Sequence, residues 1–296
     1  MATILDHLKQ TGEKEWKLED RANYLLYSTK KQVEIYSRLS RLHYKPEHEI
    51  LEEAGQTILR GFGDSLNIVG LASGPSERES ILIKAALKSG KRPKYFAIDK
   101  SFEMLRESGI NIPVRAESYH ILADLFAIDL HELREQTGNS NLITFFGYTA
   151  FNFGKTKGLS HLQRNIASGD SAVITVGTLP EDLDKLVAEY STHDIREFGL
   201  QPFLNAGFSP KNLEFKMFFD KKDKAVKFGY VILSLPHNLE NLKVSVGDYV
   251  ILATSVKLPL DGKGGYMPLI AKYLKIDEVF TEPTEMTAVI QVSAKP

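Results

Sequence analysis

The sequence predicts an α/β protein with a doubly wound parallel sheet and a second α+β domain. From residue 66 onward, short continuous apolar runs alternate with helical patterns, as in parallel sheets that helices cover on both faces. Residues 67–80 have the pattern of a buried strand that breaks at small residues and turns into a helix near Ser76. After Pro180 the alternation gives way to a hairpin pattern around residues 221–224. The chain is therefore expected to combine two different architectures.

The composition excludes several classes of protein. The 296 residues carry a formal net charge of −1, so no overall positive field attracts nucleic acid. No apolar run reaches the roughly 18–20 residues of a membrane span, and the N-terminus lacks the apolar stretch of a signal peptide. The chain has no cysteine, and its histidines show no spacing typical of a metal site or catalytic triad. We expect a soluble cytoplasmic protein, monomeric or homodimeric, with no metal and no membrane or nucleic-acid partner.

Residues 1–49 are expected to be helical. Tyr24, Tyr27, Tyr36 and Tyr44 interleave with aliphatic residues at about helical spacing. Most of these rings are expected to pack onto neighbouring structure, with their hydroxyls reaching the surface. Pro46 marks a break, and a helix over residues 47–60 leads to the first strand.

The alternating region places candidate ligand-binding residues at one edge of the sheet. Ligands of such sheets bind at the carboxyl ends of the strands, near the switch in strand order. This rule nominates residues 72–78, Asp99, Asp124 and residues 147–152 together. We expect strands at 66–71, 94–98, 118–123, 142–146 and 171–176, and helices at 76–89, 102–108, 127–136 and 159–166.

The remaining residues are expected to form an inserted α+β segment and the end of the sheet. With the N-terminal helices, the insertion would build a substrate-binding cap domain of residues 1–49 and 180–255. Residues 50–179 and 256–296 would form the sheet domain, and residues 260–265 a flexible connection or lid. We expect helices at 181–190, 195–206 and 267–274, and strands at 213–220, 225–235, 242–246, 249–257, 278–280 and 287–292.

The turn after the first strand suits an anionic or zwitterionic ligand. A strand that turns into a helix there presents backbone N–H groups and the positive end of the helix dipole. Ser73 and Gly74 allow close approach to the backbone, and Arg78 offers a fixed positive charge for a carboxylate. The spacing is not the G-x-G-x-x-G of dinucleotide sites. The alternative is an ordinary βα turn.

Two aspartates close the next two strands. Asp99 could accept both hydroxyls of a ribose, as carboxylates at this place do in nucleotide-binding sheets. Asp124 could accept the exocyclic amine of adenine, with Leu125 or Phe126 covering the ring. The alternatives are that Asp99 or Ser101 only caps the next helix and that Asp124 is a turn residue.

A more specific pattern follows the fourth strand. Residues 147–152, Gly-Tyr-Thr-Ala-Phe-Asn, resemble the G-S-T-I-G-N signature of the histidine-specific, S-adenosylmethionine-dependent methyltransferase family. The similarity is patchy but runs from about Tyr27 to the C-terminus. Residues 71–78 resemble that family's L-G-S-G-x-S-E-K cofactor loop, residues 167–170 its P-G-D turn, and residues 254–257 its E-x-S-x-K segment. The resemblance implies a Rossmann-like class I methyltransferase fold that uses S-adenosylmethionine and releases S-adenosylhomocysteine.

The resemblance also implies roles for individual residues. Asn152 and Tyr27 would orient the reacting amine, so we take these two as the catalytic residues. Tyr44 and Tyr190 would hold the rest of an amino acid, and Ser255 would lie on the side-chain side of the pocket. The cofactor-binding residues would be Ala72, Ser73, Gly74, Ser76, Arg78, Asp99, Asp124, Leu125 and Gly147.

The chain departs from the family pattern at several positions. Ala253 stands where histidine enzymes have the glutamate that binds the imidazole. Gly70 replaces the acid that closes the first strand, Ala72 replaces a loop glycine, and Tyr148 and Phe151 are bulkier than the family's residues. Loss of a buried hydrogen-bonding group removes about 1–3 kcal/mol of discrimination. We therefore expect Ala253 and Tyr148 to line a more apolar pocket that does not prefer histidine.

These observations predict methyl transfer from S-adenosylmethionine to the amine of a small molecule, above all the α-amine of an amino acid other than histidine. One alternative is an O- or C-methyltransferase of a secondary metabolite, since Tyr148 and Phe151 alter the pocket. The other is a catalytically silent S-adenosylmethionine-binding protein, which Gly70 and Ala72 favour.

Overall fold

The computed structural model describes residues 3–43, 45–237, 239, 242–284 and 286–296. The chain divides into two compact units. The large unit consists of residues 40–179 and 257–296, and the small unit of residues 1–39 and 180–256. The division falls within helix α1 (Lys30–His43).

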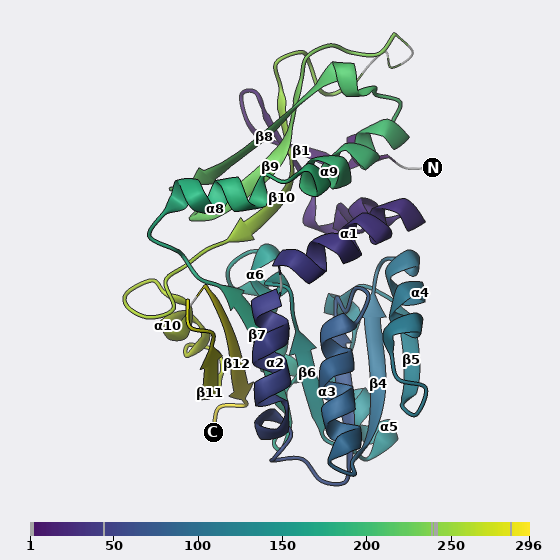
Figure 1. Cartoon of the computed structure of the whole chain (residues 1–296), viewed down its shortest axis with the longest axis vertical. Helices are drawn as coiled ribbons and strands as arrows, with labels where there is room; N and C mark the ends of the chain where they lie inside the picture. The colour runs from purple at the N-terminus through teal and green to yellow at the C-terminus, as the bar shows by residue number, and fades with distance from the viewer. Residues whose placement is uncertain (1–2, 44, 238, 240–241, 285) are drawn as a thin grey trace. The chain divides into compact units, whose positions relative to one another are not determined.

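The large unit is built on one mixed sheet with the strand order β11-β12-β7-β6-β3-β4-β5 (Figure 1). The strands β3, β4, β5, β6 and β7 run parallel, whereas β12 is antiparallel to β7 and β11 to β12. The first strand in sequence, β3, lies between β4 and β6, so the strand order reverses beside it. The strands are β3 (Ser65–Leu71), β4 (Arg92–Asp99), β5 (Glu117–Leu122), β6 (Asn141–Phe145), β7 (Ser171–Gly177), β11 (Lys275–Thr281) and β12 (Thr287–Ser293).

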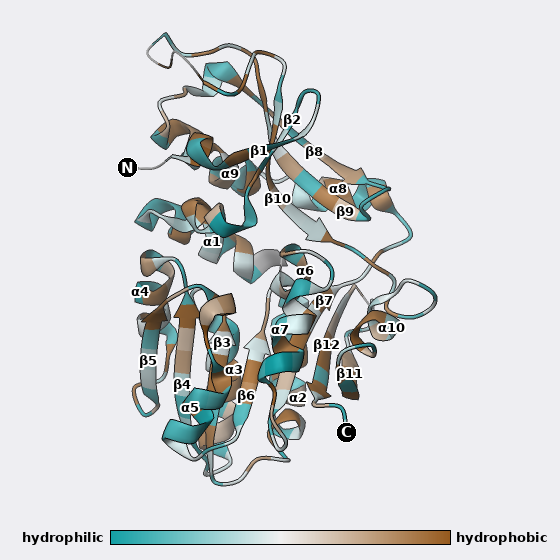
Figure 2. Ribbon diagram, turned by 180° about the vertical axis from the view of Figure 1, so that it is seen from behind, coloured by the Kyte–Doolittle hydropathy of each residue, from teal (hydrophilic) through white to brown (hydrophobic). Residues whose placement is uncertain are grey.

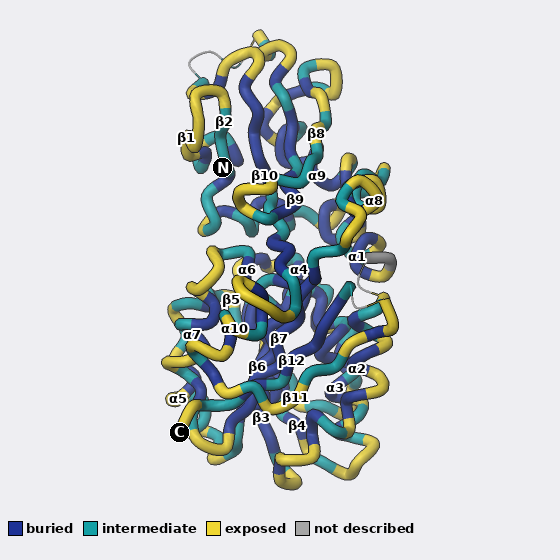
Figure 3. Tube along the Cα trace, turned by 90° about the vertical axis from the view of Figure 1, so that its left-hand side faces the viewer, coloured by how far each residue is buried: buried dark blue, intermediate teal, exposed yellow. Residues whose placement is uncertain are grey.

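Helices cover both faces of this sheet. In Figure 1, α2 and α3 lie in front of the sheet. Figure 2 shows the opposite side, where α5 and α7 lie in front of it. β3 is buried from Leu66 to Leu71, as its continuous apolar sequence requires (Figure 3). The predicted α/β class is therefore confirmed. The helices are α2 (Lys45–Ile58), α3 (Glu77–Lys88), α4 (Phe102–Asn111), η3 (Leu125–Ala127), α5 (Leu130–Thr137), α6 (Thr149–Asn152), α7 (Lys157–Asn165) and α10 (Tyr266–Ile270).

The small unit is an α+β structure with its own core. Its sheet has the order β1-β2-β10-β9-β8, with β10 parallel to β2 and antiparallel to β9. Leu18, Phe203, Ile232 and Val250 belong to one buried apolar cluster of this unit. Its elements are η1 (Ile4–His7), β1 (Leu8–Gly12), β2 (Glu15–Leu18), η2 (Asp20–Tyr27), α8 (Leu183–Tyr190), α9 (His193–Asn205), η4 (Pro210–Asn212), β8 (Leu213–Asp220), β9 (Ala225–Ile232) and β10 (Tyr249–Val256).

Residues 3–27 are not α-helical, contrary to the expectation from the sequence. They contain the hairpin β1–β2, because β2 pairs with β10, a strand more than two hundred residues later. The indole Nε1 of Trp16 also donates to Asp248 Oδ2 at 2.9 Å. Partners so distant in sequence override the local helical pattern.

Other differences concern element ends. Helix α2 begins at Lys45, so Pro46 lies in its first turn, where the missing N–H needs no partner. Residues 242–246 do not form the expected strand. There the Ser245 N–H instead donates to Asp248 Oδ2 at 2.8 Å. Among the described residues, no helix has the length and apolar character needed to cross a membrane.

Candidate active site

The turn that follows β3 has an unusual backbone. Ala72, Gly74 and Ser76 have φ values of 51°, 54° and 58°, all in the left-handed region. Ser73 and Pro75 between them lie outside that region. The N–H groups of this turn already donate within the protein, from Ser73 to the Ile98 carbonyl at 3.1 Å, from Gly74 to Asp99 Oδ2 at 3.0 Å and from Ser76 to the Ser73 carbonyl at 3.1 Å. These hydrogen bonds fix the shape of the turn, and the N–H groups of these three residues are not open to an anion as the sequence suggested.

Neighbouring elements hold this turn in place. Ser76 Oγ lies 2.6 Å from both Tyr95 Oη in β4 and Ser108 Oγ in α4. Asn111 Nδ2 donates to the Pro75 carbonyl at 2.8 Å. Ser76 is buried, and its hydroxyl links the turn to β4 and α4.

Ala72 stores strain that a glycine would not. A left-handed residue with a Cβ costs about 1–2 kcal/mol, whereas glycine adopts this conformation without that cost. Glycine also raises the entropy of the unfolded chain, which offsets part of the relieved strain. We therefore expect Ala72→Gly to raise the free energy of unfolding, measured with urea, by about 0.5–1 kcal/mol. Ala85→Gly inside α3 is the control and should destabilise by about 1 kcal/mol. Equal losses in both variants would contradict the strain.

Asp99 joins the turn to the end of β4. Its Oδ2 accepts the Gly74 N–H at 3.0 Å, and its Oδ1 accepts the Ser101 N–H at 2.8 Å. Burial raises the pKa of Asp99 and outweighs these N–H groups, which lower it. The Lys100 N–H also acts on this carboxylate, and since a carboxylate has about four acceptor positions, one remains for a hydroxyl of a ribose. The N-cap of α4 is Ser101, whose Oγ accepts the Met104 N–H at 3.2 Å.

Asp124 follows β5 and caps η3. Its Oδ1 accepts the Phe126 N–H at 3.0 Å, and Lys100 Nζ donates to its Oδ2 at 3.0 Å. Burial alone would raise the pKa of Asp124, but the Phe126 N–H and the Lys100 ammonium lower it overall. Leu125 is buried beside it, and the Phe126 ring contacts Phe153 edge-on at 5.3 Å. The Asp124 carboxylate therefore lies close to the apolar side chains of Leu125 and Phe126.

The turn after β6 carries two consecutive left-handed residues, Gly147 and Tyr148, at φ 65° and 62°. Helix α6 follows and ends at Asn152. The Oδ1 atom of Asn152 is buried and has no hydrogen-bond partner among the described residues. A buried acceptor without a donor is costly, so this atom is suited to a donor from a ligand.

Tyr148 does not present its side chain as the sequence suggested. It is 5% exposed, and its hydroxyl lies 2.9 Å from Thr287 Oγ1 in β12. Lys257 Nζ lies 4.3 Å from the centre of its ring, a cation–π contact. Phe151 is likewise buried, edge-on to Tyr266 at 4.8 Å. The bulky residues of the hexapeptide therefore pack into the interior of the large unit.

Arg78 also differs from its expected role. Its side chain is buried, with Nε 2.7 Å from Glu47 Oε2 in α2 and Nη2 donating to Ser40 Oγ at 3.1 Å. The carboxylate that meets this charge is thus one of the protein's own. Glu47 was not expected from the sequence, because a glutamate near the start of a helix usually lies in solvent.

Glu79 is a second residue that sequence reasoning missed. It is 1% exposed, and its Oε1 accepts the Thr144 hydroxyl at 3.1 Å. Burial raises the pKa of Glu79 to about 7, despite the opposing effects of its hydrogen bonds and of Arg78. A Cβ at Gly70 would lie 3.2 Å from Glu79 Oε1. The missing side chain at Gly70 therefore makes room for this carboxyl group.

The predicted residues of the small unit gather on its apolar cluster. Tyr27, Tyr190 and Ala253 all pack against that cluster. The Tyr27 ring lies edge-on to Tyr36 at 5.1 Å and 5.3 Å from Phe198. Ser255 is half-buried on β10, and the buried Thr254 Oγ1 beside it has no hydrogen-bond partner among the described residues. Tyr44 lies outside the described residues.

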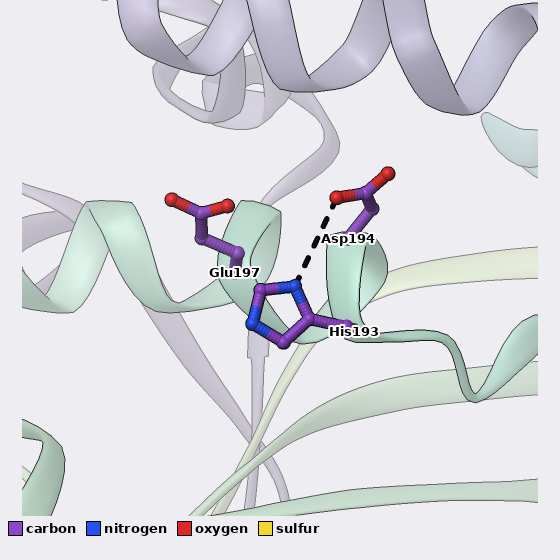
Figure 4. Close-up of side chains that lie close together, drawn as sticks. All are labelled: His193, Asp194 and Glu197. Carbon is purple, nitrogen blue, oxygen red and sulfur yellow. Dashed lines mark ion pairs between the residues drawn. The ribbon is translucent and has the colours of Figure 1, made fainter.

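Among the described residues, one cluster of potential metal ligands occurs, in the small unit. His193, Asp194 and Glu197 of α9 have ligand atoms within 4.8 Å of one another (Figure 4). Arg38 pairs with Asp194 at 3.2 Å and with Glu197 at 3.6 Å, and Lys31 pairs with Glu197 at 3.1 Å. These cations already compensate both carboxylates, so surface ion pairing explains the cluster. That the protein uses no metal stays a prediction.

The large unit fits S-adenosylmethionine, the cofactor that the resemblance implies. Asp99 suits its ribose, and Asp124 with the adjoining apolar side chains suits its adenine. A Cβ at Gly74 would have only Met104 Sδ within 4 Å among the described residues, at 3.9 Å. The backbone of the turn is thus open to close approach by the amino-acid tail of the cofactor.

Comparisons with known proteins agree with this fit. The family model described as "Histidine-specific methyltransferase, SAM-dependent" matches residues 41–292. No curated protein sequence matches the chain. The large unit has the doubly wound α/β sheet that the sequence predicts for such a methyltransferase.

Solved structures of low identity resemble the chain. The CcbJ methyltransferase from Streptomyces caelestis is 11% identical over 83% of this chain and 90% of its own, with a TM-score of 0.45. A SAM-dependent methyltransferase of Leishmania major is 12% identical over 92% and 82%, with a TM-score of 0.47. OxaC, solved with S-adenosylhomocysteine and oxaline, is 11% identical over 91% and 53%, with a TM-score of 0.49. On the match of the family model to most of its length, the chain belongs to the histidine-specific, S-adenosylmethionine-dependent methyltransferases.

Proposed function

We propose that this methyltransferase acts on the amine of a small molecule, and most readily on the α-amine of an amino acid other than histidine. The observation that carries the proposal is the buried, unpartnered Oδ1 of Asn152, at the end of the hexapeptide that follows β6. A carbonyl oxygen accepts an N–H and leaves the lone pair of a neutral amine free to react. By resemblance, this asparagine is the residue that binds the substrate's amine and carboxylate.

The reaction asks little acid–base chemistry of the protein. S-adenosylmethionine supplies a methyl group already activated on a sulfonium sulfur. The chain must therefore bind an amine, orient it and exclude water. Asn152 would orient the nitrogen with Tyr27, while Tyr44, Tyr190 and Ser255 would hold the rest of the acceptor. No strong base is needed, because an ammonium group can lose its proton to water before it binds.

The side-chain selectivity rests on Ala253. Its methyl group packs against the apolar cluster of the small unit, at the position where the family's histidine enzymes have a glutamate. An imidazole placed there would give up its hydrogen bonds to water without that acceptor, at a cost of about 1–3 kcal/mol. An apolar side chain, aromatic or aliphatic, has no such hydrogen bonds to lose. We therefore expect histidine to be a poor acceptor.

Asn152→Ala should reduce turnover by about 10- to 100-fold at saturating cofactor, because it removes one hydrogen bond to the amine. Binding of S-adenosylhomocysteine, measured by calorimetry, should stay within about twofold of the unaltered protein. Asn139→Ala is the matched control. Asn139 precedes the amino end of β6, whereas Asn152 follows its carboxyl end. The side-chain amide of Asn139 donates a hydrogen bond to Asn67. Unchanged turnover in Asn152→Ala would refute the assigned role.

The acceptor can be identified by mass spectrometry after incubation with S-adenosylmethionine and each of the twenty amino acids. A gain of one or more methyl groups on an amino acid other than histidine is the expected result. Methylation of histidine alone would refute the selectivity. If no amino acid reacts but S-adenosylhomocysteine binds, the acceptor is a larger amine or a hydroxyl compound, or the protein is catalytically silent.

A further inference from the structure

A buried glutamate of α2 contacts two parts of the candidate site at once. Glu47 is fully buried, and its Oε2 lies 2.7 Å from Arg78 Nε, in the first turn of α3. Its Oε1 accepts the backbone N–H of Gly147 at 3.1 Å. One carboxylate therefore holds the helix that follows the cofactor turn and the residue that opens the hexapeptide.

The guanidinium of Arg78 completes the connection. A Cβ at Gly147 would lie 3.5 Å from Arg78 Nη1, so the bare backbone of this glycine faces the guanidinium. On another side Arg78 Nη2 donates to Ser40 Oγ at 3.1 Å. Both members of the ion pair are at least nine-tenths buried. A buried pair adds little net stability, but an arrangement that separates its members leaves an uncompensated buried charge and is therefore disfavoured.

We propose that Glu47 is a positioning residue for cofactor binding: through Arg78 and Gly147 it keeps the cofactor turn and the hexapeptide in one fixed arrangement. Glu47 is buried, and its contacts with Arg78 and Gly147 are the means by which it would act. The proposal rests on the cofactor and on the large unit alone. Failure to find an amine acceptor would therefore leave it intact.

The test compares cofactor affinity with stability. Glu47→Gln keeps the shape and an oxygen for the Gly147 N–H but removes the charge that Arg78 faces. Titration with S-adenosylhomocysteine, at a temperature where circular dichroism shows every variant folded, should give about tenfold weaker binding for Glu47→Gln and for Arg78→Met. In the double variant with both substitutions, the fold-loss of affinity for S-adenosylhomocysteine should be much smaller than the product of the two single losses, because each single change already breaks the ion pair.

Asp170→Asn is a matched control. Asp170 is a buried carboxylate that pairs with Arg134 and accepts the Asn141 N–H at 2.8 Å, at the amino ends of β6 and β7. The Asp170→Asn substitution should lower the melting temperature but leave the affinity for S-adenosylhomocysteine unchanged. Glu47→Gln behaving in the same way would overturn the proposal, since the pair would then serve stability alone.

A conservative variant covers the case in which Glu47→Gln does not fold. Arg78→Lys keeps the charge but loses the planar fork that reaches Glu47 and Ser40 together. It should weaken S-adenosylhomocysteine binding by about threefold to tenfold in a folded protein. Wild-type affinity in this variant would also overturn the proposal.

Discussion

Glu79→Gln should flatten part of the pH dependence of stability. The native pKa of Glu79 is raised by burial to about 7, above its ordinary value of 4.5. The folded chain therefore holds this proton more tightly than the unfolded chain does. The resulting stability is fully present below pH 4.5 and is lost as the pH rises to about 7, a change of about 3 kcal/mol.

The measurement is urea unfolding at several pH values between 4.5 and 8. The stability of the wild type minus that of Glu79→Gln should fall by about 3 kcal/mol across the lower part of this range and level off above pH 7. The control is Glu278→Gln, which removes an exposed carboxylate on β11. A constant difference between wild type and Glu79→Gln would mean that the native pKa of Glu79 is not raised above its value in the unfolded chain.

Asp99→Asn should weaken binding of S-adenosylhomocysteine by about 10- to 100-fold. The amide offers one oxygen where the carboxylate offered two, and its NH₂ group would face either the Gly74 or the Ser101 N–H. The turn would lose an anchor, and the ribose would lose an acceptor. Calorimetric titration of the folded variant gives the change in affinity directly.

Asp129→Asn is the comparison for Asp99→Asn. Asp129 caps α5 by accepting the N–H groups of His131 and Glu132, away from the turn that follows β3. This variant should bind S-adenosylhomocysteine like the wild type. If Asp99→Asn did so as well, the Asp99 carboxylate would be a structural anchor without a part in cofactor binding.

The sheet of the large unit was predictable because its signals are local. The central strands β3, β6 and β7 are largely apolar runs, and Asp99 and Asp124 follow from the rule for strand ends. The edge strand β5 lacks such a run and is mostly exposed. The hairpin of residues 8–18 was not predictable in this way, because its stability depends on β10 at the other end of the chain. Local periodicity carries no information about such a partner.

The roles of charged residues in the site were harder to predict than their positions. Arg78 lies where the sequence placed it, at the start of α3, but Glu47 and Gly147, which it contacts, are distant in sequence. The same holds for Tyr148, whose ring is turned inward by a left-handed backbone and held by Thr287. Pairing of buried polar groups is decided in three dimensions, so spacing alone does not reveal it.

Gly70 and Glu79 compete for the same small space. The family resemblance expects an acid at position 70, whereas here a carboxyl group lies beside this position from helix α3. A Cβ at position 70 would lie 2.8 Å from Ser73 Cβ and from Tyr95 Oη, and 3.2 Å from Glu79 Oε1. A side chain at position 70 therefore requires these neighbours to shift. An acid can be placed there only together with a rearrangement of the residues around it.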